Sequence, residues 1–107
     1  MTDTFGKIKQ LVIADNIRVS QHGFRRLVSH SIRSDDLVAS IVNAVVLEDY
    51  PAYHTGPAVL VLQYDANGAP LHAVWGVEKG TDEPAVLITA YRPDPSLWSD
   101  DFRTRKP

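Results

Sequence analysis

Two apolar stretches lie close together in the second half of the chain, Leu71-His72-Ala73-Val74-Trp75-Gly76-Val77 and Ala85-Val86-Leu87-Ile88-Thr89-Ala90-Tyr91-Arg92. Both are rich in β-branched and aromatic residues, which favour β-strands. The segment that separates them, Glu78 to Pro84, is short and polar. This arrangement predicts a β-hairpin, and most of the aromatic and aliphatic side chains of the second half lie in it or just before it.

Two further strands are predicted before this hairpin. Ala58-Val59-Leu60-Val61-Leu62-Gln63-Tyr64 is almost entirely apolar, so we expect a central strand that is covered on both faces. The pair Asn67-Gly68 that follows favours a tight turn, which makes the next strand antiparallel. The segment from Val45 to Tyr50 is expected to form the first of these strands and to end at Pro51.

The first half of the chain has helical patterns. A helix to about Asp15 is predicted with Thr2 or Asp3 as its N-cap, and a third helix opens at Ser34, where two acidic residues favour the helix start. Between them, Ser20 caps a second helix over Gln21 to His30, whose apolar side is expected to face the sheet and consists of Phe24, Leu27 and Val28.

Two shorter segments are less regular. The residues Ile17-Arg18-Val19 are expected to form either a short extended link or an edge strand. After Pro93-Asp94-Pro95, residues 96–103 are predicted to form one or two helical turns, because Trp98 and Phe102 have i,i+4 spacing. The chain as a whole, residues 1–107, is expected to be a single α+β domain, with N-terminal helices packed on one face of a roughly four-stranded, mostly antiparallel sheet.

Composition excludes several classes of site. The 107 residues include no cysteine, which excludes disulfides and thiolate metal sites. The four histidines do not follow a metal-ligand spacing, so no metal and no cofactor is expected. No signal-peptide pattern and no membrane-spanning apolar run is present, and we therefore expect a cytoplasmic protein without membrane contact.

The net charge of −2 counts against a nucleic-acid binder, but the charge is unevenly distributed. Four arginines and no acidic residue lie between Ile17 and Ser34. Within this segment His22 and Arg26 have i,i+4 spacing and point the same way, with Arg25 beside them. A histidine and an arginine suit phosphodiester chemistry, because one exchanges protons and the other binds phosphate. The alternative interpretation is an ordinary solvated helix face.

A second polar group is expected in the hairpin. His72 lies in a strand among apolar neighbours, and Thr89 and Tyr91 alternate on one face of the last strand. If the hairpin register places His72 on that face, the three side chains form a compact polar cluster. The alternative is a structural histidine whose hydrogen bonds are satisfied.

Several motifs occur in the order typical of one family. They are His22-Gly23-Phe24-Arg25-Arg26, the strand that ends in Glu48-Asp49-Tyr50-Pro51, Leu71-His72-Ala73-Val74, and Ile88 to Pro95 followed by Trp98. From Ile17 to Trp98 the chain resembles the bacterial domain-of-unknown-function family 4258. Members often have HAxxRM in the helix, whereas here Gly23 replaces the alanine and Leu27 the methionine.

That family is similar to the RelE/ParE-like toxin superfamily, which has helices on a small antiparallel sheet and includes metal-independent ribonucleases. The resemblance implies a toxin-like endoribonuclease acting on RNA. In it, His72 would be the acid or base, Tyr91 its partner or a donor to the phosphate, and Arg26 with Arg92 the phosphate clamp. His22 is the alternative base, and Arg25 and Thr89 would contact the substrate. The competing hypothesis is a non-catalytic module that binds an antitoxin, another partner protein or a second copy of itself.

Overall fold

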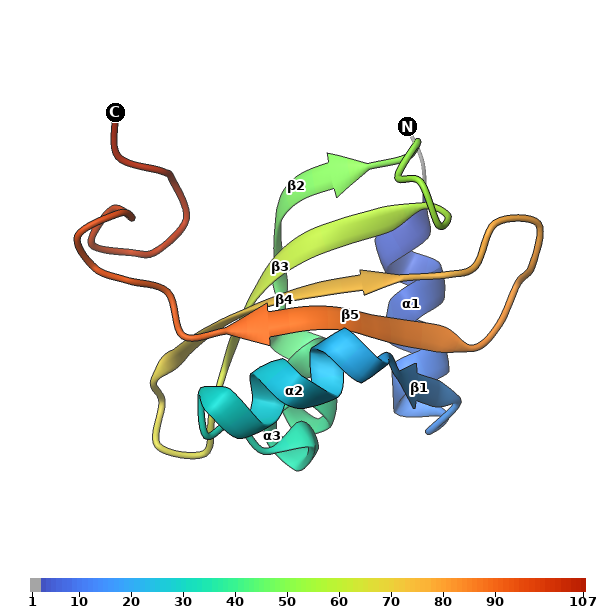
Figure 1. Ribbon diagram of the computed structural model, residues 1–107, viewed down its shortest axis with the longest axis horizontal. Coiled ribbons are helices and arrows are strands. Elements are labelled where there is room, and N and C mark those ends of the chain that lie inside the picture. The colour runs from blue at the N-terminus through green and yellow to red at the C-terminus, as the bar shows by residue number, and fades with distance from the viewer. Residues whose placement is uncertain (1–2) are drawn as a thin grey trace.

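A five-stranded sheet with strand order β1-β5-β4-β3-β2 organises the computed structural model, which describes residues 3–107 (Figure 1). The strand β1 pairs with β5 in parallel, and all other neighbours are antiparallel. The strands are β1 (Ile17–Val19), β2 (Val45–Tyr50), β3 (Ala58–Tyr64), β4 (Pro70–Gly76) and β5 (Ala85–Tyr91). The predicted α+β class is therefore confirmed. The strand beyond the predicted four is β1, the segment for which the sequence predicts either an extended link or an edge strand.

The turn chemistry predicted between β3 and β4 is present. Gly68 has φ 80°, a left-handed conformation that glycine adopts without strain. The carboxylate of Asp65 accepts hydrogen bonds from the backbone N–H groups of Asn67 and Ala69, both at 2.9 Å. These contacts fix the turn and thereby the register of β3 with β4, in which Leu62 lies opposite His72.

Two helices cover one face of the sheet. The helix α1 (Thr4–Ile13) packs Ile8 and Val12 into the core, and α3 (Ser34–Ser40), followed by a 3₁₀ turn at Ile41–Asn43, adds Leu37. Asp3 makes no side-chain cap, and Thr2 lies outside the described residues. On the sheet side this core contains the alternate residues of the central strands, among them Val59, Val61, Leu71, Ala73, Trp75 and Leu87.

One buried polar residue ties a helix to the sheet. The amide nitrogen of Gln63 donates to the carbonyl of Leu37 at 2.7 Å, and its oxygen accepts from the indole N–H of Trp75 at 2.8 Å. Gln63 is fully buried, so these bonds replace the water that its amide loses. The single polar residue that interrupts the apolar pattern of β3 is therefore a structural link between α3 and the sheet.

The helix α2 (Gln21–Ser29) follows the short edge strand β1 and, like β1, lies along β5 (Figure 1). Ser20 caps it as predicted, accepting from the N–H of Gly23 at 2.9 Å. The predicted burial of Phe24 and Val28 is wrong, because the helix turns Gly23 and Leu27 toward the sheet. Phe24 and Val28 are 61% and 65% exposed.

The C-terminal strap, defined here as residues 93–107, lies at one end of the sheet (Figure 1, orange to red). It covers part of the second face, where Trp98 and Phe102 contact His72. The predicted helical turns over residues 96–103 are wrong. The strap instead folds back on itself, with the N–H of Ser99 donating to the carbonyl of Thr104 and that of Lys106 to Leu97. Asp101 favours this turn because its carboxylate accepts from the Ser99 hydroxyl and the Arg103 N–H. Among residues 3–107, no helix is long and apolar enough to span a membrane.

Candidate functional site

The second face of the sheet carries the predicted polar cluster. His72 lies directly opposite Tyr91 in the β4–β5 pairing, and Thr89 lies opposite Val74 on the same face. The hydroxyl of Tyr91 is 3.2 Å from His72 Nδ1, and the two rings meet edge to face at 5.3 Å. The hairpin register therefore brings these side chains onto one face.

The His72 imidazole is hydrogen-bonded at both nitrogens. Its Nε2 lies 2.8 Å from the carbonyl oxygen of Phe102, which can only accept, so Nε2 carries the proton and donates. In the neutral ring Nδ1 then accepts from the Tyr91 hydroxyl. Burial lowers the pKa of His72 below its ordinary value, and the Phe102 carbonyl only partly opposes this shift. The structure thus favours a neutral imidazole of defined tautomer.

The C-terminal strap covers this cluster. Trp98 packs edge to face on His72 with ring centroids 4.3 Å apart, and the guanidinium carbon of Arg105 lies over the Trp98 ring, 4.7 Å from its centroid. Arg105 also forms a two-point contact with Glu48 of β2, at 3.2 and 3.3 Å. This contact from Arg105, with a hydrogen bond from Tyr50, lowers the pKa of Glu48. His72 is fully buried, so no ligand can reach it unless the strap is displaced.

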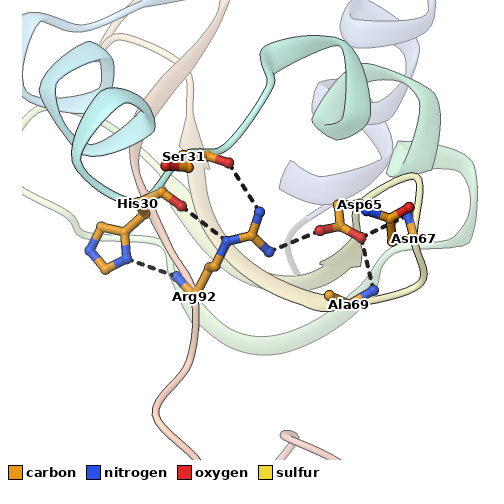
Figure 2. Close-up of polar contacts among 6 residues, drawn as sticks. All are labelled: His30, Ser31, Asp65, Asn67, Ala69 and Arg92. Atoms are coloured by element: carbon orange, nitrogen blue, oxygen red, sulfur yellow. Dashed lines mark hydrogen bonds and ion pairs between the residues drawn. The ribbon is translucent and has the colours of Figure 1, made fainter.

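Arg92, a predicted phosphate ligand, is engaged by the protein itself (Figure 2). Its guanidinium donates to the carbonyls of His30 and Ser31 at 3.0 Å each and pairs with Asp65 at 2.9 Å. Its backbone N–H lies 3.3 Å from His30 Nδ1. Arg92 therefore joins the C-terminal end of α2 to the β3–β4 turn, and its donors face protein acceptors.

An open cleft occupies the other end of the same sheet face. It has a volume of about 620 Å³, and its apolar floor is formed by Gly76, Val86 and Ile88 from the ends of β4 and β5. His72 and Gly76 are four residues apart on one strand, so the cleft lies roughly 13 Å from the buried cluster. A cleft of this size is typical of sites for small molecules or single nucleotides.

Polar side chains from three segments border the cleft. His22 comes from the first turn of α2, Tyr53 from the β2–β3 loop, and Arg18 from β1. Arg18 forms an ion pair with Glu78, which follows β4 and also lines the cleft. The apolar floor and these groups provide a surface for a ring and donors for an anion.

The remaining predicted site residues lie on or near α2 and β5. Arg26 is exposed and follows His22 by one turn, so the two share a flank as expected from their spacing. Arg25 is exposed and points away from the sheet, since it is about 200° around the helix from the buried Gly23. Thr89 is half-buried between the cleft and the His72 cluster. Of the predicted residues, the structure thus places only His22 in the open cleft.

Sequence patterns did not identify Arg18, Tyr53 and Glu78, because they come from separate segments that the sheet brings together. The parallel pairing of β1 with β5 places Arg18 opposite Val86. No local spacing encodes that contact. Within residues 3–107 no group of three or more histidine, aspartate or glutamate side chains is arranged to hold a metal ion.

Comparison with known proteins gives one family. The model of the domain of unknown function DUF4258 matches residues 19–92, which run from the last residue of β1 to the residue after β5 and include every predicted site residue. Comparisons with curated proteins and with solved structures found no match. Because the family model covers more than half of the 107 residues, the chain belongs to the DUF4258 family.

Proposed function

We propose that the protein is a metal-independent endoribonuclease that binds single-stranded RNA in the open cleft and uses His22 in catalysis. The observation that carries the proposal is the cleft itself. An accessible imidazole, an arginine–glutamate pair and a tyrosine border a cavity of about 620 Å³ with an apolar floor.

The cleft supplies the groups that cleavage of RNA requires. A phosphate that enters beside Arg18 competes with Glu78 for the guanidinium, because both are anions. In the proposed reaction the released Glu78 carboxylate takes the proton of the ribose 2′-hydroxyl, and O2′ attacks the phosphorus. The bond from phosphorus to O5′ breaks, and His22 gives its proton to O5′. The products are a 2′,3′-cyclic phosphate end and a 5′-hydroxyl end.

Other residues have binding roles in this proposal. The ring of Tyr53 and the apolar floor offer surfaces on which an unpaired base stacks. Arg26, on the same flank of α2 as His22, is placed to bind the next phosphate along the strand. His72 and Tyr91 are assigned a structural role, because the strap buries His72 and occupies both of its nitrogens.

The test is cleavage of a mixed-sequence single-stranded RNA by the full chain in EDTA. Removing a general acid typically lowers a rate about 10²- to 10⁴-fold, so His22→Ala is expected to lose at least about 100-fold. Arg18→Ala is also expected to lose cleavage, because it removes the guanidinium that binds the phosphate. Gln21→Ala, at the adjacent helix position, is the matched control for His22→Ala, and Arg33→Ala is the matched control for Arg18→Ala. Both controls are expected to cleave as the wild type does.

Two results would reject the proposal. If the folded wild type leaves the RNA intact, the protein is not a ribonuclease of this kind, and a protein-binding role becomes the better account. If His22→Ala retains full activity while His72→Gln loses it, the strap-covered cluster is the catalytic site instead. An intact fold of each variant is checked by its circular dichroism spectrum and unfolding midpoint.

A further inference from the structure

The outward surface of α2 has an apolar pair that the fold leaves in solvent. Phe24 and Val28 are one helical turn apart and are 61% and 65% exposed. Single exposed apolar residues are common, but an aromatic and a β-branched residue side by side on one helix are candidates for a binding surface. Together with Gln21 and Arg25, which lie on the same outward side, they define the α2 surface.

The exposure of this pair follows from the way in which α2 is held. A Cβ atom on Gly23 would lie 2.6 Å from the carbonyl oxygen of Leu87, so the backbones of α2 and β5 are in close approach. Ser20 fixes the helix start, with its N–H donating to Leu87 and its hydroxyl to the Ile88 carbonyl, both at 3.0 Å. Any rotation of α2 that buried Phe24 would turn Gly23 away from β5 and break these bonds. The packing of α2 on β5 therefore holds the side chains of Phe24 and Val28 in solvent.

The charge of the α2 surface indicates what covers it. Neither the Arg25 nor the Arg26 guanidinium forms an ion pair within residues 3–107. In contrast, Arg18, Arg92 and Arg105 each pair with a carboxylate. No acidic residue occurs between Ile17 and Ser34, so the helix itself supplies no counter-charge.

We propose that the α2 surface binds a partner protein through an acidic amphipathic segment. Its apolar side chains would cover Phe24 and Val28, and its carboxylates would pair with Arg25. A second copy of this chain is disfavoured, because a two-fold contact centred on these residues brings Arg25 close to its own equivalent. RNA would use the arginine but would leave Val28 without an apolar partner. This inference does not depend on ribonuclease activity.

The experiment is selection of a random 16-residue peptide library displayed on phage against the full chain. The selection is counter-screened with the double variant Phe24→Ser, Val28→Ser. The expected peptides contain apolar residues at i,i+3 or i,i+4 spacing and carry a net negative charge. Their affinity should fall at least tenfold on the double variant and at least tenfold on Arg25→Glu. It should be unchanged on Val42→Ser, which alters an exposed apolar residue of the 3₁₀ turn.

Several results would overturn the inference. One is a set of selected peptides that are neutral or basic, or that bind the double variant as tightly as the wild type. Another is failure to enrich any peptide that depends on the α2 surface. Equal loss of single-stranded RNA binding by the double variant and by Arg25→Glu would make this an RNA surface. A concentration-dependent dimer that the double variant abolishes would make it a self-association surface. RNA cleavage by the double variant is measured in parallel. Cleavage equal to that of the wild type would show that the loss of peptide binding is independent of the proposed function.

Discussion

The neutral state of His72 makes the stability of the protein depend on pH in a defined window. Burial lowers the pKa of His72 in the folded chain below the ordinary value of 6.5. As pH falls, the unfolded chain therefore takes up this proton first, which favours unfolding. The stability that the neutral histidine contributes is fully present above about pH 7 and is lost as pH falls through the folded-state pKa.

The size of the effect can be worked out for a change from pH 7.5 to 5.5. If His72 stays neutral in the folded state, its protonation in the unfolded chain lowers the free energy of unfolding. The decrease is RT ln(1 + 10), or about 1.4 kcal/mol, at pH 5.5 and about 0.1 kcal/mol at pH 7.5. The free energy of unfolding should thus fall by up to about 1.3 kcal/mol. The pKa values of Glu48, Asp65, Asp94 and Asp101 are also lowered, but carboxylates titrate below this window.

Urea unfolding followed by tryptophan fluorescence at the two pH values measures this change. The informative variant is His72→Gln, whose amide can donate to the Phe102 carbonyl and accept from Tyr91 but does not titrate. We expect the pH-dependent loss in the wild type and in His54→Gln, an exposed control, and not in His72→Gln. The reasoning is refuted if His72→Gln loses as much stability as the wild type, or if the wild type loses none.

Three further predictions concern the contacts that hold the fold. Gln63→Leu should lower the free energy of unfolding by about 2–4 kcal/mol, because it leaves the Trp75 indole N–H and a buried carbonyl unpaired; an unchanged urea midpoint would contradict this. Arg92→Ala should lower the free energy of unfolding by about 2 kcal/mol, whereas the exposed control Arg33→Ala should lower it by less than about 0.5 kcal/mol. Equal values would show that the Arg92 contacts contribute little to stability. Trp98→Ala should speed tryptic cleavage within the C-terminal strap about tenfold, because the strap opens more often; wild-type kinetics would mean that other contacts hold it.

The strands could be predicted because their signals are local. Apolar runs rich in β-branched and aromatic residues, the Asn67-Gly68 turn and the polar loop before Pro84 define β3, β4 and β5 within the sequence itself, and along each strand the side chains alternate between the two faces. The His72–Tyr91 cluster followed from the same alternation once the hairpin register was known. Its burial could not be predicted, because the strap that covers it contacts residues about 30 positions away.

The rotation of α2 shows where a local pattern fails. Helical periodicity grouped Phe24 with Leu27 and Val28, and by that pattern the group should face the core. The structure instead buries Gly23, because a residue without a side chain lets α2 approach the backbone of β5. A hydrophobicity pattern gives glycine no weight, so the contact that sets the helix rotation carries no signal. The cleft was missed for a related reason, since its lining depends on the pairing of β1 with β5.

The proposed function depends on RNA binding in the open cleft beside His22 and not at the cluster beneath the strap. The most direct measurement is an amide chemical-shift titration of the full chain with a single-stranded DNA oligonucleotide, which lacks the 2′-hydroxyl and is not cut by the proposed reaction. The proposed function predicts saturable shifts at Arg18, His22 and Ile88, with the amides of the strap unchanged. Shifts confined to the strap and the region around His72, or no saturable shift at all, would contradict it.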